Sequence, residues 1–273
     1  MLEITARQRL RLPVLTTVAS AYGSLPANLG VFLRIAWLPL LIIGTLAYVL
    51  YTIKYQVLLD TQPDRRGALT SPLADILMPL VLWPLMSSIA VAWHLYLLRG
   101  ERPRGWFQLR FDGRVWKYLG FVLLMGLGAL MLIGPPTIVL SIAGVAANLG
   151  SFALLAPLLV VSVCALTYIA RFALVLPVLA LGRRLPIEDV LHKTRGNALP
   201  IAAGSVLTAA PVIACVAALY QLWPVNIDQW TASSMAMLTT AAVLLSVVLM
   251  SIHLDFLSNA YRHFLGAPPP EPH

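Results

Sequence analysis

The chain has 273 residues, of which 59% are hydrophobic and 11% are charged, and its formal net charge is +8. Soluble domains carry about a quarter charged residues, so few charges could not cover so much apolar surface in water. Composition therefore excludes a water-soluble fold, and because the basic residues stand in short segments beside apolar runs, it also argues against a nucleic-acid partner.

Residues 1–30 precede the first long apolar run. They include Arg7, Arg9 and Arg11, but no compact apolar core with a cleavage site follows, so we expect no signal peptide. One apolar stripe of a helix is formed by Val14, Val18, Tyr22, Leu25 and Leu29. We predict a cytosolic interfacial helix here, lying in the plane of the lipid headgroups.

Six apolar stretches are long enough to span a membrane, which takes about 20 residues for about 30 Å of hydrocarbon. Backbone polar groups in lipid have to bond within the segment, so each stretch is predicted to be a helix. The stretches are 31–53, 74–98, 117–140, 151–180, 200–223 and 235–258. The sequence thus predicts an all-α membrane protein with a six-helix transmembrane domain at 31–260. A disordered, proline-rich cytosolic tail is predicted at 261–273.

The lysines and arginines of the connecting segments are unevenly distributed. The N-terminal segment, the C-terminal tail and the second and fourth connections between spans together hold 14 of them. The first, third and fifth connections hold only Lys54, Arg65 and Arg66. Cytosolic loops carry the excess of basic residues in membrane proteins. Both termini are therefore predicted to be cytosolic, which agrees with an even number of helices.

The connection between the second and third predicted spans mixes aromatic and basic side chains, and we call it the basic-aromatic segment. This combination suits an anionic membrane surface. These residues are Trp106, Arg110, Arg114, Trp116 and Lys117. Residues 187–195 predict a further interfacial helix, with acidic residues first and basic residues last, as the helix dipole favours, and with Gly196 as its stop. Anionic lipid headgroups are thus the expected partners of this face.

The order of these segments indicates an internal repeat. A short tripeptide centred on a leucine precedes each of three pairs of spans, and we call these tripeptides cues: Asn28-Leu29-Gly30, Tyr118-Leu119-Gly120 and Ala198-Leu199-Pro200. The second span of each pair ends at Gly100, Gly182 or Gly266. The cue-to-glycine distances are 71, 63 and 67 residues. Our hypothesis is a unit of interfacial helix plus hairpin that occurs three times.

Ionisable residues in the spans lie toward the ends of their helices, where snorkelling to headgroups or pairing at the interface explains them. The alternative is a shared pocket. His94, Arg171 and His253 each occupy the late part of the second helix of a predicted pair. If the hairpins pack around one axis, these three residues form a basic, cytosolic-side pocket for a phosphate or carboxylate, such as a lipid headgroup.

Small residues and prolines provide two further predictions. Helix contacts are expected at Ala210, Ala214 and Ala218, and at Gly120, Gly126 and Gly128. Kinks or breaks are expected at Pro79, Pro84, Pro135, Pro136, Pro157 and Pro177. No HExxH, GxSxG or GxxxxGK[ST] motif occurs, and no paired carboxylates lie in the spans, so we expect no catalysis, metal or cofactor.

Three stretches carry a resemblance to a known group. They are Ala27–Pro39, Trp93–Pro103 and the stretch from Arg171-Phe172 to Thr194-Arg195-Gly196-Asn197. They resemble bacterial six-helix inner-membrane proteins, namely the YciC-like proteins and the membrane domain attached to some glycerophosphodiester phosphodiesterases. This resemblance of pattern covers most of the chain and implies a place in the bacterial cytoplasmic membrane. The 273 residues include no soluble phosphodiesterase domain, so that activity is not implied.

Two functions stay open from the sequence. The favoured one is a non-catalytic scaffold or accessory protein that binds lipid, a membrane partner complex or a second copy of itself. The alternative is a transporter or channel for a small solute or lipid, which broken helices and a repeat would suit. It lacks the midplane ionisable residue that an ion-coupled carrier usually needs. A third function, an intramembrane enzyme acting on lipid, would need a nucleophile or metal cluster that the sequence does not offer.

Overall fold

The computed structural model describes residues 11–60, 72–103, 105–106, 109–146, 151–183, 186–222 and 231–266. The regular elements in these ranges are all helices. In chain order they are α1 (Val14–Ala27), α2 (Leu29–Asp60), α3 (Pro72–Arg99), α4 (Gly113–Ala146), α5 (Ser151–Ala173), α6 (Val175–Ala180), α7 (Ile187–Lys193), α8 (Ala198–Leu222) and α9 (Ala232–Leu265). The predicted all-α class is confirmed. Helix α9 continues past residue 261, where the tail was predicted to begin, and residues 267–273 lie outside the described residues.

Five of the described helical segments are long and apolar enough to cross a membrane. They lie in α2, α3, α4, the α5–α6 region and α9. The predicted fifth span, 200–223, corresponds to α8, whose described apolar part, Ala198–Pro211, is shorter than a span. The chain is therefore compatible with a multi-pass membrane protein, and the sixth crossing stays a prediction.

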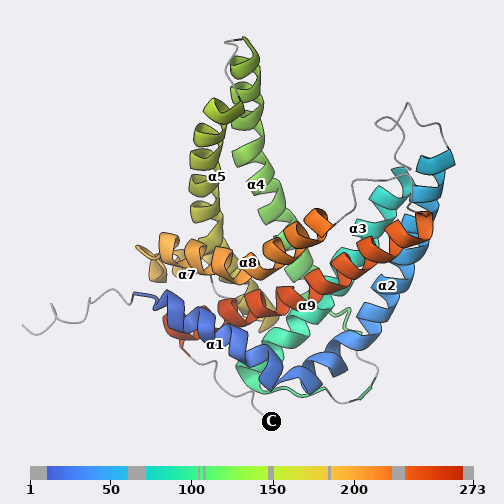
Figure 1. The fold of residues 1–273 in the computed structure, drawn as a ribbon. Helices are drawn as coiled ribbons and strands as arrows, with labels where there is room; N and C mark the ends of the chain where they lie inside the picture. The colour runs from blue at the N-terminus through green and yellow to red at the C-terminus, as the bar shows by residue number, and fades with distance from the viewer. Residues whose placement is uncertain are drawn as a thin grey trace, which may run out of the picture.

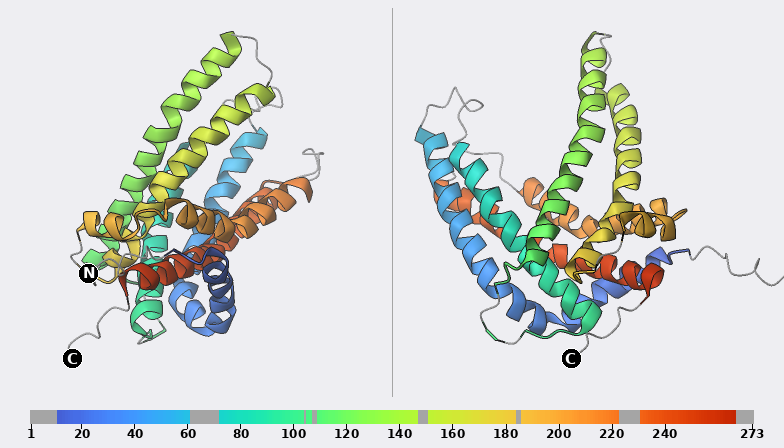
Figure 2. Two further views of the ribbon diagram at one scale, coloured as in Figure 1. Left: turned by 90° about the vertical axis from the view of Figure 1, so that its left-hand side faces the viewer. Right: turned by 180° about the vertical axis from the view of Figure 1, so that it is seen from behind.

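The long helices lie in three pairs, α2 with α3, α4 with α5, and α8 with α9 (Figure 1). Helices α4 and α5 form an arm that stands away from the other pairs at its far end, as both views of Figure 2 also show. Helix α9 crosses the molecule and packs along α2, and it also contacts α1, α3 and α8. The three pairs meet at their bases, where the core lies.

Burial differs sharply between the base and the arm. The largest fully buried side chains near the base include Phe32, Trp93, Leu174, Phe256 and Tyr261. In contrast, no residue in the most apolar stretch of α4 is buried. Exposed apolar surface costs about 25 cal/mol per Å² in water, so such a helix needs lipid or another apolar surface around it.

Each pair begins after an Asn or Asp residue and ends near a glycine. Helices α2, α4 and α8 follow Asn28, Asp112 and Asn197. Helix α3, helix α6 (which continues α5) and helix α9 end near Gly100, Gly182 and Gly266, whose φ angles are 72°, 67° and 78°. Glycine adopts this left-handed conformation without strain, which is why it ends helices so often.

These boundaries revise one cue of the proposed repeat. The distances from Asn28, Asp112 and Asn197 to these glycines are 72, 70 and 69 residues, which is more uniform than the distances from Leu29, Leu119 and Leu199. The second cue, Leu119, lies inside α4, whose start is capped by Asp112 Oδ1. That oxygen accepts from the backbone N–H groups of Arg114 at 3.1 Å and Val115 at 3.2 Å. Similarly, the predicted stop after α7 is confirmed, because Gly196 has a φ of 86°.

The expected proline breaks occur at one place. Helices α3, α4 and α5 continue through Pro79, Pro84, Pro135, Pro136 and Pro157. The chain leaves the helix only at Leu174, between α5 and α6. Pro177 has no N–H to donate to the carbonyl four residues earlier, which accounts for the break at that turn.

The predicted small-residue contacts are wrong for the described residues. Ala210, Ala214 and Ala218 are exposed, and a Cβ added at Gly120, Gly126 or Gly128 would meet no atom within 4 Å. The close approach lies elsewhere. A Cβ at Gly204 would stand 2.2 Å from Cζ of Phe256, so α8 can lie on α9 only because residue 204 has no side chain.

Candidate functional site

Two of the three residues of the predicted pocket make polar contacts that involve α9, His94 being buried and His253 half-buried. His94 on α3 is fully buried, and its Nδ1 lies 2.8 Å from Oγ of Ser258 on α9. His253 on α9 has its Nδ1 3.0 Å from Oγ1 of Thr208 on α8. The two imidazoles are close enough to influence each other electrostatically. These contacts link α3 and α8 to α9 through polar side chains.

Arg171, the third predicted member, lies in different surroundings. Its guanidinium donates to the backbone oxygen of Leu191 on α7. No contact between Arg171 and either histidine is found among the described residues. The arginine therefore joins α5 to α7, and the structure does not bring the three residues of the hypothesis together.

A buried carboxylate on α9 was missed as a site residue. Asp255 on α9 is 1% exposed, and neither carboxylate oxygen has a hydrogen-bond partner at normal geometry in the described part of the chain. Ser24 on α1, Trp93 on α3 and Arg262 on α9 are the polar groups that face it. A sequence signal existed, because Ser251, Asp255 and Ser258 form a polar stripe on an otherwise apolar helix, and all three are buried.

The basic-aromatic segment docks on the pair of helices that precedes it. Trp37 Nε1 on α2 donates to the backbone oxygen of Trp106 at 2.6 Å, and the guanidinium of Arg34 lies 5.9 Å from the centre of the Trp106 ring. The backbone N–H of Arg110 donates to Oγ of Ser88 on α3 at 3.0 Å. The Trp106 side chain stays 71% exposed despite these contacts.

The other two segments predicted to be interfacial, α1 and α7, also rest on the pair of helices that precedes them. Helix α7 contacts α5 of the preceding pair through Arg171. Helix α1 packs on α8 and α9, where the Tyr22 hydroxyl donates to the backbone oxygen of Leu207 at 2.8 Å. Partial burial raises the pKa of Tyr22 above its ordinary value, so this hydroxyl keeps its proton. Each segment thus rests on the pair before it in a closed cycle, in which α1 rests on the last pair.

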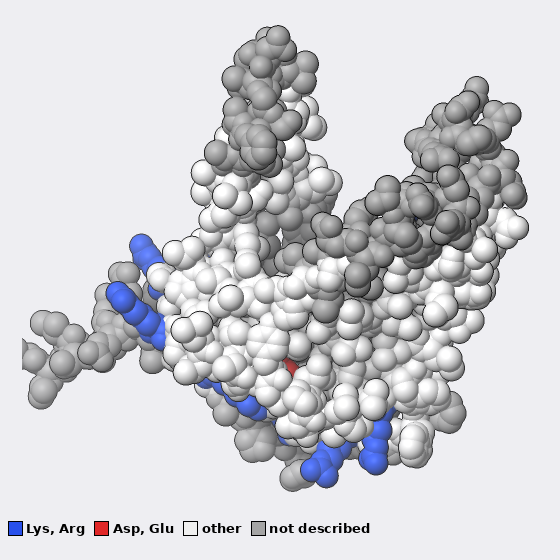
Figure 3. Space-filling view, viewed as in Figure 1, with Lys and Arg blue, Asp and Glu red and all other residues white. Residues whose placement is uncertain are grey.

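Three arginines close the base of the molecule. Arg99 at the end of α3 donates to the backbone oxygen of Leu181 at 2.9 Å, and Arg183, after α6, donates to the Tyr261 hydroxyl of α9 at 2.9 Å. Arg262 of α9 donates to the backbone oxygen of Leu97 on α3. The ends of α3, α6 and α9 are therefore joined in a triangle. Figure 3 shows the Lys and Arg atoms that are visible from this side along the left edge and the lower edge of the molecule, and none on the white parts of the helices above.

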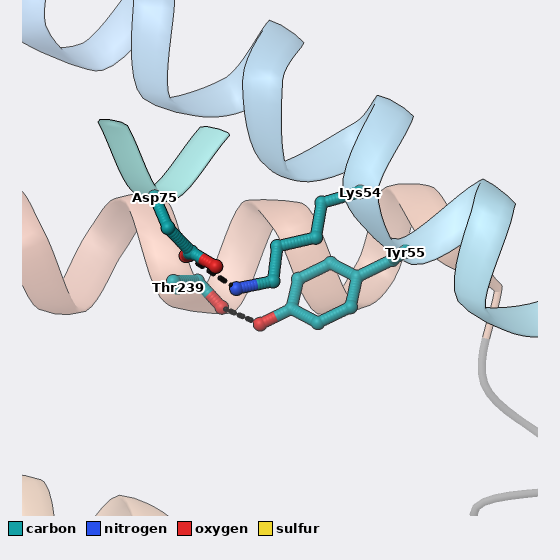
Figure 4. A network of polar contacts seen from close by, with 4 residues as sticks. All are labelled: Lys54, Tyr55, Asp75 and Thr239. Carbon is teal, nitrogen blue, oxygen red and sulfur yellow. Dashed lines mark hydrogen bonds and ion pairs between the residues drawn. The ribbon is translucent and has the colours of Figure 1, made fainter. Parts of the chain in front are cut away.

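At the end of α2 that lies away from the base, the charged side chains form a neutral pair. Lys54 Nζ lies 2.6 Å from Asp75 Oδ1 of α3, and the Tyr55 hydroxyl lies 2.9 Å from Oγ1 of Thr239 on α9 (Figure 4). Pairing with Asp75 cancels the charge of one of the three basic residues on that side. The contrast with the arginine-rich base is therefore larger than residue counts alone indicate.

The exposed part of the basic-aromatic segment continues along the start of α4. The Trp116 side chain is exposed and its ring lies 6.4 Å from that of Phe111, while Lys117 next to it is exposed as well. These side chains could contact headgroups directly. No group of three His, Cys, Asp or Glu side chains within the described ranges is placed to hold a metal ion.

Comparison of the chain with protein-family models, with curated proteins and with solved structures finds no significant match. Function is consequently inferred from the residues and their geometry.

Proposed function

We propose that the chain is a non-catalytic, multi-pass protein of the bacterial cytoplasmic membrane that binds anionic lipid headgroups at its cytosolic face, in a scaffold or accessory role. In this proposal both termini are cytosolic and the chain crosses the membrane six times. The observation that carries it is the combination of an unburied apolar arm, α4 and α5, with a base on which arginines and lysines gather. A bilayer provides an environment for both, because its hydrocarbon core surrounds apolar helices and its headgroup layer, next to that core, attracts basic side chains.

The six crossings follow from the proposed three-unit repeat. Helices α2, α4 and α8 occupy equivalent places in units of 72, 70 and 69 residues, each with an Asn or Asp before its first helix and a positive-φ glycine at its end. The cyclic packing of the cytosolic segments supports the same division. If α8 is the counterpart of α2 and α4, it crosses as they do.

Headgroup binding is supported by the side chains at the start of α4. Exposed tryptophans prefer the headgroup level of a bilayer, and each basic residue near an anionic leaflet contributes about 1 kcal/mol of attraction. Trp106, Trp116 and Lys117 meet this description. Their contacts with the core leave the exposed faces available to lipid.

The proposal is tested by thermal unfolding of the full chain in nanodiscs of phosphatidylcholine with increasing phosphatidylglycerol. We expect the midpoint to rise with the anionic lipid, and the rise to shrink in a Trp116→Ala/Lys117→Gln variant. A Lys54→Gln/Asp75→Asn variant, which alters polar groups at the opposite end, should keep the full rise. Equal midpoints in neutral and anionic nanodiscs would contradict headgroup binding.

The transporter alternative has one observation in its favour, the buried polar groups of His94 and Asp255, because such groups within apolar helices often mark a solute path. Against it, the basic pocket that this alternative requires is incomplete, since Arg171 is turned to α7. We therefore place lipid or partner binding first.

A further inference from the structure

Helix α1, near the beginning of the chain, packs against both helices of the last pair, α8 and α9 (Figure 1). Its buried side chains form one stripe, because successive residues of a helix are about 100° apart. They are Thr17, Val18, Ala21 and Leu25. Helix α1 contains no charged residue, whereas a helix that lies in the headgroup layer on its own usually carries basic side chains on its polar face. The position of α1 is therefore set by its contacts with α8 and α9.

Polar side chains flank this buried stripe on both edges. On one edge the Tyr22 hydroxyl donates to the backbone oxygen of Leu207 on α8 at 2.8 Å. On the other edge Ser24 faces the carboxylate of Asp255 on α9. Each edge of α1 thus meets a polar group of a different helix of the last pair.

The carbonyl that Tyr22 reaches is one that α8 cannot satisfy in the usual way. In an α-helix the oxygen of residue 207 accepts from the N–H of residue 211. That position is occupied by Pro211, which has no N–H, although α8 continues through it. Prolines are tolerated in membrane helices where a neighbouring group bonds the carbonyl that they leave free. Tyr22 of α1 supplies this donor to Leu207.

Helix α8 has more need of such support than the other long helices. Its described apolar part, Ala198–Pro211, is shorter than a span. Its neighbour α9 carries Asp255, whose side chain is 1% exposed with α1 in place, and a carboxylate that faced hydrocarbon would be costly. Helix α1 therefore covers two polar groups, one on each helix of the last pair.

We propose that α1 is a strap that holds α8 in the membrane by covering the Leu207 carbonyl and the Asp255 carboxylate. The inference rests on the proposed function, because it requires that α8 crosses the membrane. It adds that a crossing near the end of the chain depends on a helix near its beginning. Tyr22 is in this view a positioning residue, which acts through the backbone of α8.

A first experiment tests the pairing of Tyr22 with Pro211 by thermal unfolding of the full chain in phosphatidylcholine nanodiscs. Tyr22→Phe removes the donor, so the midpoint should fall. Pro211→Ala gives the Leu207 oxygen a donor within α8, so Tyr22→Phe should lower the midpoint much less in that background. Equal losses from Tyr22→Phe in the two backgrounds would overturn the strap.

The control for this experiment is Tyr55→Phe, which removes a hydroxyl that lies 2.9 Å from Oγ1 of Thr239 at the far end of α2. Mutations at distant sites act independently, so its effect on the midpoint should be the same with Pro211 as with alanine at that position. A dependence of the Tyr55→Phe loss on residue 211 as large as that of Tyr22→Phe would also overturn the strap, because Pro211→Ala would then act on the whole fold.

A second experiment measures the crossing itself, with alkaline phosphatase inserted after Leu222 and the rest of the chain retained. Ala21 is fully buried under α1, so Ala21→Arg should unseat the helix and abolish most of the phosphatase activity. Ala19 lies on the exposed face of α1, and Ala19→Arg adds the same charge without entering the contact, so activity should persist.

The outcomes of the second experiment separate the strap from the proposed topology. Equal activity in the unmodified chain and in both variants would overturn the strap and leave the crossing of α8 standing. Loss of activity in Ala19→Arg as well would assign the effect to the added charge and overturn the strap. Absence of activity in the unmodified chain would contradict the crossing of α8 and the strap together.

Discussion

Replacing Gly204 with alanine is expected to lower the unfolding midpoint more than any other glycine-to-alanine change in the described helices, and to reduce the yield of folded protein. The new Cβ would lie 2.2 Å from Cζ and 2.3 Å from Cε2 of Phe256. Phe256 is fully buried and cannot turn aside, so α8 has to move off α9. Overpacking of this kind costs about 1–3 kcal/mol, and more where the backbone has to shift.

Thermal unfolding in detergent micelles measures this effect against two matched controls. Gly44→Ala meets only the flexible side chain of Leu244 at 3.3 Å, so a small loss is expected. Gly126→Ala enters open space on α4 and should be neutral or slightly stabilising, since alanine is favoured over glycine in helices by about 1 kcal/mol. If Gly204→Ala behaved like Gly126→Ala, the close packing of α8 on α9 would be wrong.

The second large effect is expected for Trp93→Ala, which empties the centre of the base. Trp93 is fully buried, with its ring edge-on to Phe32 at 5.4 Å and stacked on Tyr96 at 5.3 Å. It also faces the carboxylate of Asp255. Removing a buried tryptophan costs about 3–5 kcal/mol, because apolar contacts are lost and a cavity is left behind.

The same helix supplies the control for this prediction. Trp83 on α3 is 48% exposed on the apolar surface, and Trp83→Ala should change the midpoint of unfolding little. A Trp93→Phe variant keeps most of the ring and should recover most of the stability. Comparable losses at positions 83 and 93 would mean that the core is not at the base of the helix pairs.

Sequence patterns predicted what depends on local chemistry. Apolar length predicted the five described helical segments that are long enough to cross a membrane. Gly100, Gly182 and Gly266 marked helix ends, because a left-handed residue is a local requirement. The predicted start of the second unit at Leu119 is wrong, because the side chain of Asp112 caps the start of α4 and Leu119 lies inside that helix.

Patterns failed where the answer depends on which face of a helix meets protein. Lipid is as apolar as a protein core, so Ala210 and Ala214 facing outward look the same in sequence as Gly204 facing Phe256. For the same reason the depth of His94 and Arg171 could be estimated but their directions could not. The packing of α1 on the last pair joins residues nearly the whole chain apart, and no local pattern carries that information.

The number of crossings and their direction are tested most directly by paired fusions of green fluorescent protein and alkaline phosphatase, placed after Asp60, after Leu222 and after Gly266. We expect active phosphatase and no fluorescence at the first two sites, and fluorescence without phosphatase activity at the third. Fluorescence after Leu222 would mean that α8 does not cross the membrane. Phosphatase activity after Gly266 would place the C-terminal end outside the cytosol and contradict the proposed topology.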